Sequence, residues 1–521
     1  MHADLSRSTF RPQRHYSAVI AQQGRVQLDA DLNEQAAIQL HQARTLAADL
    51  IGRHGGPGGQ PGRVPGFRIE YVGGKLDIDT LYIHGGRYYV DGILCDADRP
   101  APGIPVLDEG AEEPQQTAGT DAYWDYWNQP DGFRDPENPA DRLPSPAQSP
   151  FVVYLKVWER AVSAAEDPAL REVALGAALP DTAVRAKVVW QVLPLSLTAL
   201  DIEDGEPSAQ AVRDAFEKWA TAQAAPSARL AARSERPEHA DEDPCLVRPD
   251  AHYRGPENQL YRVEIHAGGE AKDATFKWSR ENGSVVFPVD ELDGTWVQLA
   301  NLGFDGKLDL EVGDHVEFTD TAYASRLEPL PLLRVEELDL PGRRVRLSAE
   351  PDPHVGRLPH LHPFLRRWDH HEGLRRKGRT AALKGGAVPV TEGEWLPLED
   401  GVEVYFAKGG GYRTGDHWLI PARTSTGSVE WPADAARRPL LQSPAGIDRH
   451  FAPLALVQGE GSTVDLRFAF GPLGTDIPAA DQGALDAEAL AAREEQAAEA
   501  DPSGGRSQTT AAAEAAVEGD D

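Results

Sequence analysis

Residues 151–160 read FVVYLKVWER, and this stretch decides the fold class because apolar side chains occupy both of its alternating faces. The first four odd positions carry Phe, Val, Leu and Val, and the first four even positions carry Val, Tyr, Lys and Trp. Successive side chains of a β-strand point to opposite faces, so the pattern predicts a strand that is largely buried on both faces. A second apolar run, from Ala186 to Leu195, predicts the neighbouring strand.

The same two-residue period recurs over much of the chain. After Gly66, apolar positions alternate between turn signals such as Gly85-Gly86, which predicts a β-meander. Further strands are predicted at residues 260–265, 275–280 and 308–350. The dipeptide Asn282-Gly283 suits the positive φ angles of a tight type I′ hairpin. The sequence therefore predicts a mainly β protein, built from β-meander, sandwich or small-barrel units.

Two segments depart from this period and predict helices. In the first, apolar residues recur at three-and-four spacing along one stripe: Leu32, Ala36, Leu40, Ala43, Leu46, Ala47 and Leu50. Such a stripe needs a partner surface, which is either a neighbouring subunit or the protein's own β domain. We expect an assembly interface on this helix and on the Arg- and Gln-rich segment before it, with contributions from Arg7, Arg14, Tyr16, Leu32 and Leu40. The second predicted helix begins after Ser208.

The length of 521 residues exceeds what one hydrophobic core normally supports, so several domains are expected. Their expected bounds are 1–58 for an N-terminal docking arm and helix, 59–205 for a first β domain with a loop insertion at 100–150, 206–250 for a helix and linker, 251–350 for a second β domain, 351–474 for a third β region with a His-rich loop, and 475–521 for a tail. The tail has almost no large apolar residues, which predicts disorder. The expected fold class is mainly β and multi-domain, with an N-terminal helical arm, one inserted helix and a disordered acidic C-terminal tail.

Charge and composition argue against several classes of function. The formal net charge of -31 disfavours binding to nucleic acid or to an anionic membrane surface, because both need clustered Lys and Arg. No apolar run reaches the roughly 18 residues that indicate a membrane-spanning helix. The two cysteines, Cys95 and Cys245, cannot form a disulfide framework or a four-ligand zinc site. No secretion signal precedes the first predicted helix, so we expect synthesis and assembly in the cytoplasm.

An aromatic cluster lies in the polar stretch at residues 100–150, which predicts a long surface loop. Tyr123, Trp124 and Trp127 offer ring faces for stacking on a sugar, which would suit a carbohydrate- or receptor-binding module. The alternative is that these rings fasten the loop to its own domain.

A histidine group supplies the one local set of metal-ligand residue types. His360, His362, His370 and His371 carry the imidazoles that zinc or iron sites use. Their spacing differs from helical ligand spacing such as HExxH, so a loop without metal is the alternative.

Enzymatic function has little basis in the sequence. Glu166 and Glu172 are a candidate pair for glycoside hydrolysis, which needs two carboxyl groups roughly 5 to 10 Å apart. Salt bridges within a loop are the alternative interpretation. The chain has no nucleotide-binding, serine-hydrolase or redox motif, so no catalytic residue, metal or cofactor is assigned.

Several blocks of sequence carry a family resemblance. They are DLSRSTF at 4–10, HYSAVIAQQGRVQLDADLNEQ at 15–35, FVVYLKVWER at 151–160, stretches within 253–285, and YRTGDHWLIPAR at 412–423. In these blocks the chain resembles DUF6519, an uncharacterised bacterial family found in gene clusters of extracellular contractile injection systems, which are phage-tail-like particles.

The resemblance implies a structural role rather than catalysis. A peripheral baseplate or fibre-like protein is expected, oligomeric in the assembly, with other subunits of the particle as partners. It would be made and assembled in the bacterial cytoplasm and released with the particles. The rival functions are a carbohydrate- or receptor-binding module at the target cell surface and a glycan-degrading enzyme.

Overall fold

The computed structural model describes residues 1–58, 64–73, 79–98, 123–146, 149–176, 179–202, 207–234, 253–302, 308–371, 375–376, 379–380, 382–459 and 461–471. Met1–Phe470 form one compact unit. The predicted disordered tail at 475–521, residues 100–122 and 147–148 of the predicted loop at 100–150, and Cys245 lie outside the described residues. The described part is mainly β, as the alternating sequence pattern predicts.

The strand pair predicted from FVVYLKVWER lies in a four-stranded sheet with the order β28-β27-β7-β8. Its strands are β7 (Phe151–Val162), β8 (Arg185–Ser196), β27 (His450–Gly459) and β28 (Ser462–Asp465). β7 pairs with β8 over its whole length, from Phe151↔Ser196 to Val162↔Arg185. The central position of β7 and β27 explains the long apolar runs in their sequences.

The two faces of β7 enter two different cores, as the alternation predicts. The odd positions from Phe151 to Val157 join one core with the rings of Phe67 and Tyr88. Two further sheets surround that core, β29-β1-β4-β5 and β2-β3-β6. Their strands are β1 (His54–Pro57), β2 (Ile69–Val72), β3 (Thr80–His84), β4 (Arg87–Val90), β5 (Ile93–Asp96), β6 (Tyr123–Asp125) and β29 (Ala469–Phe470).

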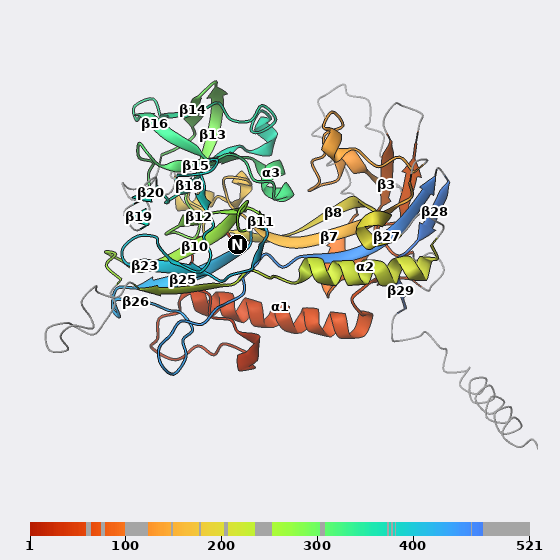
Figure 1. Cartoon of the computed structure of the whole chain (residues 1–521), viewed down its shortest axis with the longest axis horizontal. Coiled ribbons are helices and arrows are strands. Elements are labelled where there is room, and N and C mark those ends of the chain that lie inside the picture. The colour runs from red at the N-terminus through yellow and green to blue at the C-terminus, as the bar shows by residue number, and fades with distance from the viewer. Residues whose placement is uncertain are drawn as a thin grey trace, which may run out of the picture. The chain divides into compact units, whose positions relative to one another are not determined.

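The even positions Val152 and Tyr154 of β7 pack against helix α2 (Ala209–Ala224) through its residues Val212 and Phe216. The side chain of Ser208 caps this helix by accepting a hydrogen bond from the backbone N–H of Ala211. Figure 1 shows α2 lying along the sheet beside β27. The helix predicted after Ser208 is therefore present and covers the second face of the sheet.

A five-stranded sheet has the order β21-β12-β10-β25-β26. Its strands are β10 (Gln259–Ala267), β12 (Thr275–Ser279), β21 (Val388–Pro389), β25 (His417–Arg423) and β26 (Ser428–Val429). One face shares a core with a three-stranded sheet of β9 (Leu230–Ser234), β22 (Trp395–Pro397) and β23 (Val402–Phe406). A short pair, β11 (Gly269–Glu270) and β24 (Gly411–Tyr412), lies beside these sheets.

Six strands close into a barrel with the order β13-β14-β17-β16-β15-β18. They are β13 (Val286–Asp293), β14 (Trp296–Leu299), β15 (His315–Thr319), β16 (Leu333–Asp339), β17 (Arg344–Leu347) and β18 (Phe364–Trp368). Apolar residues that alternate along these strands fill the interior. Helix α3 (Thr321–Arg326) follows β15. The barrel fits the small-barrel expectation.

The remaining elements are short. They are the pair β19 (Arg375–Arg376) and β20 (Arg379–Thr380), and the 3-10 helices η1 (Pro12–Arg14), η2 (Tyr126–Asn128), η3 (Pro139–Asp141), η4 (Pro168–Leu170), η5 (Val173–Leu175), η6 (Leu197–Leu200) and η7 (Pro359–Leu361).

The strands do not group in the order of the predicted sequence segments. β27, from the segment 351–474, inserts between β28 and β7, which places it in the sheet of the first β domain. β25, from the same segment, pairs with β10 of the second β domain. Hydrophobic periodicity identifies strands but carries no information on which distant strand becomes a neighbour.

The predicted hairpin at Asn282-Gly283 needs a correction. The turn itself is present, since Asn282 has φ 53° and Gly283 has φ 66°. The strands on its two sides nevertheless do not pair, because β12 joins the five-stranded sheet and β13 joins the barrel. The turn is therefore a connection between two sheets.

Candidate functional site

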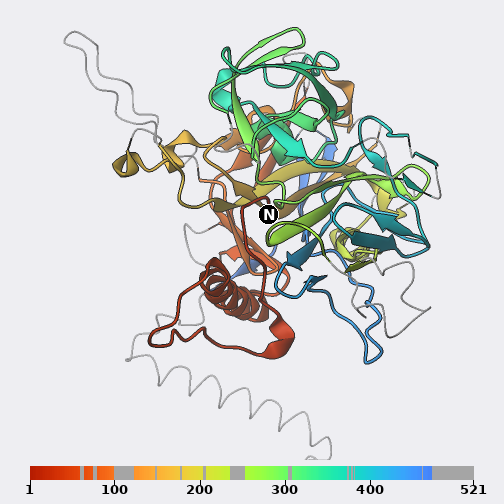
Figure 2. The same ribbon diagram turned by 90° about the vertical axis from the view of Figure 1, so that its left-hand side faces the viewer.

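The N-terminal helix α1 (Asp29–Ile51) is the first candidate, because one of its faces packs on the protein and the other does not. Ala30 and Ile38 are buried. Leu32 and Leu40 follow the buried Ala30 and Ile38 by two residues each, which at about 100° per residue places them on the far side of the helix. Figures 1 and 2 show α1 at the periphery of the unit, below the sheets in Figure 1.

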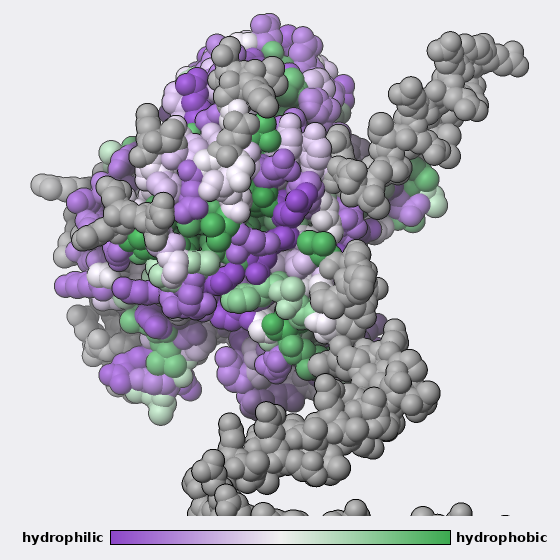
Figure 3. All heavy atoms as spheres, turned by 90° about the vertical axis from the view of Figure 1, so that its right-hand side faces the viewer, coloured by the Kyte–Doolittle hydropathy of each residue, from purple (hydrophilic) through white to green (hydrophobic). Residues whose placement is uncertain are grey.

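The predicted apolar stripe lies on this unpacked side. Leu32, Leu40, Leu46 and Leu50 have exposed fractions of 58%, 44%, 61% and 58%. Ala36 and Ala43, between them, are also exposed. Most large apolar side chains of a folded chain find partners within it, so a helix-long exposed stripe marks an interaction surface. Figure 3 shows hydrophobic and hydrophilic side chains interspersed on the right-hand face of the unit.

The segment before the helix lies along α1 and is fastened to it by polar contacts. Ser6 donates through its backbone N–H and its hydroxyl to the carboxylate of Asp29, at 2.8 and 2.6 Å. Farther along, the hydroxyl of Thr9 donates to Glu34 at 2.5 Å. The segment also exposes apolar side chains of its own, including Ile20 and Val26. The arm is therefore attached to the helix and adds exposed apolar residues to the N-terminal region.

The predicted interface residues of the arm differ in their exposure. Arg14 and Tyr16 are exposed, the latter by 58%. Arg7 is half-buried and lies 3.4 Å from the carboxylate of Glu430. Arg44 anchors the helix to β7 through two hydrogen bonds to Glu159, of 2.8 and 2.6 Å. The anchor lies on the inner side, so the stripe remains free for a partner.

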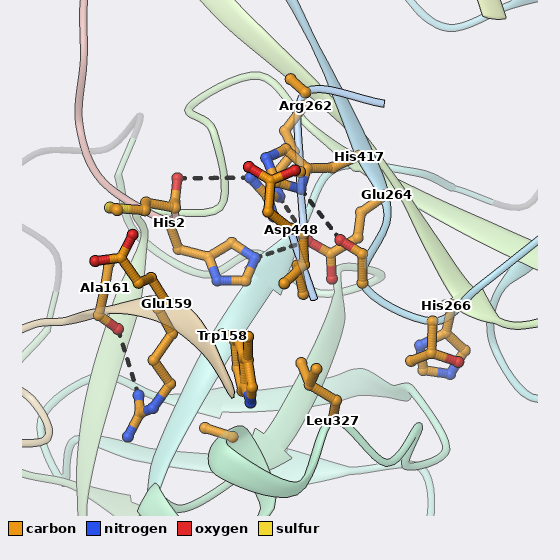
Figure 4. A pocket seen from close by; sticks show the side chains of 18 of the residues that line it. His2, Trp158, Glu159, Ala161, Arg262, Glu264, His266, Leu327, His417 and Asp448 are labelled. Carbon is orange, nitrogen blue, oxygen red and sulfur yellow. Dashed lines mark hydrogen bonds and ion pairs between the residues drawn. The ribbon is translucent and has the colours of Figure 1, made fainter. Parts of the chain in front are cut away.

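The second candidate is a polar cavity of about 200 Å³. It lies where β7, the five-stranded sheet and the barrel meet the first residues of the chain. Figure 4 shows Arg262 and His417 on one side of it and Trp158 and Leu327 on the other. Exposed Glu328 and Asp448 belong to the lining, so the cavity reaches the surface near them.

Strand alternation aims charged side chains into this cavity. Along β10, Tyr261, Val263 and Ile265 enter the apolar core on one face. The intervening Arg262, Glu264 and His266 project from the opposite face and line the cavity. They are buried all the same, with exposed fractions of 2%, 5% and 6%, because the barrel covers that face.

The buried charges form a connected network. Arg262 donates to Glu264 at 2.5 Å, and His2 donates to the same carboxylate at 2.8 Å. The ammonium group of Lys277 bridges Glu264 and Glu317, at 3.4 and 3.1 Å. Charged groups buried this deeply are stable only when they are paired in this way.

The network shifts the protonation equilibria of its members. Burial acts to raise the pKa of Glu264, but Arg262, His2 and Lys277 outweigh it and hold the pKa well below its usual value. Burial lowers the pKa of His266 to about 4, with a further contribution from Lys277. The pKa of His417 is also well below its usual value, through burial and then Arg262. Both carboxylates are therefore charged and both imidazoles neutral near pH 7.

The aromatic cluster lies on the edge of a sheet, which corrects its assignment to a long surface loop. Residues 123–125 form β6, which pairs with β3. The indole N–H groups of Trp124 and Trp127 donate to the backbone oxygens of Ala97 and Asp79. Both indoles pack against the core, whereas Tyr123 is 38% exposed and lies with its ring centroid 4.1 Å from that of Tyr82. The cluster therefore fastens its segment and presents one tyrosine pair outward.

The four predicted metal-ligand histidines are separated in burial and in partners. His360 and His371 are exposed, and His362 is partly buried. His370 is fully buried, and its Nε2 donates to the backbone oxygen of Gly386 at 2.8 Å. Within the described ranges, no group of three His, Cys, Asp or Glu side chains is placed to hold a metal ion.

The two carboxylates of the candidate catalytic pair, Glu166 and Glu172, also differ in burial and in partners. Glu166 is buried and accepts a hydrogen bond of 2.5 Å from Arg160. Glu172 is exposed and caps η5 by accepting from the backbone N–H of Ala174. Both carboxylates thus have structural partners. The structure buries Cys95, and burial raises the pKa of its thiol to about 12.

Sequence reasoning missed the cavity. Its signal is the alternation of ionisable and apolar residues in LYRVEIHA at 260–267. That alternation is typical of a strand with one solvated face, so the burial of the charged face depends on the barrel, which comes later in the chain.

The fold and these two features define a mainly β protein with an exposed helical arm and a buried polar cavity. A family model described as "Family of unknown function (DUF6519)" matches residues 1–236 and 221–519. The matches span nearly the whole chain, so the protein belongs to this family. No curated protein and no solved structure is detectably similar to it. No helix in the described part of the chain is both long enough and apolar enough to cross a bilayer.

Proposed function

We propose that this protein is a non-catalytic structural component of a contractile injection particle, at a peripheral baseplate or fibre-like position. Helix α1 and the arm before it would dock on a neighbouring subunit of the particle. The observation that supports this role is the exposed leucine stripe on α1. The particle itself is suggested by the sequence resemblance.

The stripe has the properties of an assembly surface. Burying one leucine side chain stabilises a complex by roughly 1.5 to 3 kcal/mol, so four in a row supply a substantial hydrophobic centre. Around them, Arg7, Arg14 and Tyr16 add polar and aromatic contacts that set the orientation of a partner. The protein would be made in the bacterial cytoplasm, be oligomeric in the assembly, and leave the cell with the particles.

A double substitution tests the proposal. Leu32→Gln with Leu40→Gln should abolish co-sedimentation with purified particles while leaving the melting temperature within about 2 °C of the wild type, because neither side chain is buried in the isolated chain. The matched control is Leu340→Gln with Leu358→Gln, two leucines that are 52% and 51% exposed elsewhere. That control should co-sediment normally.

A third variant separates docking from folding. Ile38→Ala removes a side chain from the buried face of α1, and it should cost about 2 to 5 kcal/mol of unfolding free energy. Normal incorporation of the folded Leu32/Leu40 variant into particles would refute docking through α1. A large loss of stability in that variant would show that the stripe belongs to the protein's own core.

A second function, carbohydrate or receptor binding at the target cell, is favoured by one observation. Tyr123 is exposed and lies against Tyr82, which offers a small aromatic platform. If this platform binds glycans, wild-type protein should give discrete signals on a glycan array that Tyr123→Ala removes. No signal from the wild type would eliminate this function. The geometry does not support the hypothesis of a glycan-degrading enzyme, because Glu166 and Glu172 have structural partners.

A further inference from the structure

The polar cavity has an uneven charge. Its buried network holds three cationic side chains, Arg262, Lys277 and Arg366, but only two carboxylates, Glu264 and Glu317. The other arginines of the lining, Arg44 and Arg160, have carboxylate partners of their own. Glu328 and Asp448 lie at the exposed mouth, where water screens their charge. Counted over the described residues, the network therefore carries one more positive charge than negative charges.

Arg366 is the cation of the network that forms no ion pair with a carboxylate of the described residues. It lies on β18 opposite Glu317 of β15 and is 8% exposed. Lys277, rather than Arg366, makes the close ion pair with Glu317, at 3.1 Å. Among the described residues, none forms a hydrogen bond with the buried Nε of Arg366. A guanidinium group in such a place is suited to pairing with an oxyanion that enters the cavity.

Residues that line the cavity also carry buried polar atoms that have no partner within the described part of the chain. Within the described part of the lining, the buried polar atoms that lack a partner are all nitrogens: Trp158 Nε1, Arg160 Nε and Nη2, His266 Nδ1 and Arg366 Nε. Indole and guanidinium nitrogens only donate. A buried donor without a partner is costly, so a wall of this kind favours a ligand that supplies acceptor oxygens.

The rest of the wall is apolar. Ile93, Leu327 and Ile447 line the cavity together with the ring of Trp158. The volume of about 200 Å³ lies below the range of roughly 300 to 1,000 Å³ that is common for drug-sized ligands. The occupant is therefore small and has both an anionic and an apolar part.

We propose that the cavity binds a small organic carboxylate, with its carboxylate group paired to Arg366 and its body against Trp158 and Leu327. A single negative charge matches the one uncompensated cation. An inorganic phosphate would place up to two charges beside Glu264 and Glu317, and it has no apolar part to contact the indole. The flat carboxylate also matches the two-pronged geometry of a guanidinium group.

Calorimetric titration of the full-length protein at about 0.15 M salt tests this site, with sodium benzoate, sodium propionate and sodium phosphate as probes. Wild-type protein should bind benzoate or propionate at one saturable site and bind phosphate more weakly. Arg366→Gln should weaken carboxylate binding by at least about tenfold. Arg344→Gln, an exposed arginine elsewhere on the barrel, is the matched control and should bind like the wild type.

Two further variants cover the possibility that Arg366→Gln fails to fold. Arg366→Lys keeps the charge but removes the two-pronged donor, and Trp158→Phe keeps a ring but removes the N–H. Each should bind carboxylate several-fold more weakly than the wild type. The proposal is overturned if neither carboxylate binds, if phosphate binds more tightly than both, or if the folded variants at 366 and 158 bind like the control.

Discussion

At the scale of single residues, the turn at Asn282-Gly283 shows how a local signal acquires a second role. The amide group of Asn282 is fully buried and donates to the backbone oxygens of Met1 and Ala3, at 3.0 and 2.8 Å. Its oxygen accepts from Arg262 of the cavity network at 3.3 Å. The dipeptide predicts the positive φ angles, but its contact with the start of the chain depends on the tertiary fold.

A pair of glycine substitutions separates these two roles. Gly294→Ala changes a residue with φ +59° and open space around it, so it should cost about 1 kcal/mol from backbone strain alone. Gly283→Ala has a similar φ of +66°, but its Cβ would lie 2.8 Å from Cδ2 of His2. It should cost about 2 to 3 kcal/mol in urea denaturation. Equal costs for the two variants would contradict close packing of the N-terminal segment on the turn.

His370 predicts a specific dependence of stability on pH. Burial lowers its pKa to about 3, whereas an unfolded histidine titrates near 6.5. The unfolded chain therefore binds a proton that the folded chain refuses, and the free energy of unfolding falls as pH drops below about 6.5. Between pH 7 and pH 5 this one residue should account for about 2 kcal/mol of lost stability.

The measurement compares wild-type protein with His370→Gln by urea denaturation at both pH values. The variant should lose about 2 kcal/mol less than the wild type over this interval. His54 and His266, whose pKa values burial also lowers to about 4, titrate alike in both proteins and cancel from the comparison. Parallel pH profiles would show that His370 is protonated in the folded state.

At the scale of elements, the local sequence pattern predicts well that a strand or helix exists. For β7 it also predicts which faces of the element are buried. The sequence of β7 predicts two buried faces, and both are buried. Helix α1 ends at Ile51, and the next residue, Gly52, has φ 90°, which glycine adopts readily. The stripe of α1 is visible in the sequence, but periodicity alone cannot show whether a stripe is packed or exposed.

The aromatic segment and β10 show why other elements could not be predicted. Residues 123–125 pair with β3, which lies across a stretch of more than thirty residues, so nothing local marks them as a strand. β10 reads as a strand with one solvated face, and only the barrel makes that face an interior. In both cases burial is decided by a partner that the local sequence does not contain.

At the scale of the whole molecule, sequence separation and spatial proximity differ sharply. β27 pairs with β7 from His450↔Val157 to Val457↔Phe151, and β23 pairs with β9 from Val402↔Ser234 to Phe406↔Leu230. Composition along the sequence predicts domains as continuous segments. These strand pairings instead depend on hydrophobic cores to which strands from distant segments contribute. The first core, for example, includes Leu454 and Val457 beside residues of β7.

These long-range pairings predict that the protein stays folded when the backbone is cleaved between residues 235 and 252. They also predict that the part before the cleavage site does not fold when it is expressed alone. Cleavage at a protease site inserted in that stretch should leave the elution volume on size exclusion unchanged, because paired strands and shared cores hold the two pieces together. The fragment 1–240 expressed alone lacks β27, which leaves one edge of β7 unpaired and part of the first core exposed to water. It should therefore be insoluble or lack a cooperative melting transition.

An uncut protein carrying the same insertion is the control. If fragment 1–240 were monomeric and melted cooperatively, the strands before residue 235 would form an autonomous domain, and the interleaved arrangement would not be needed for its stability.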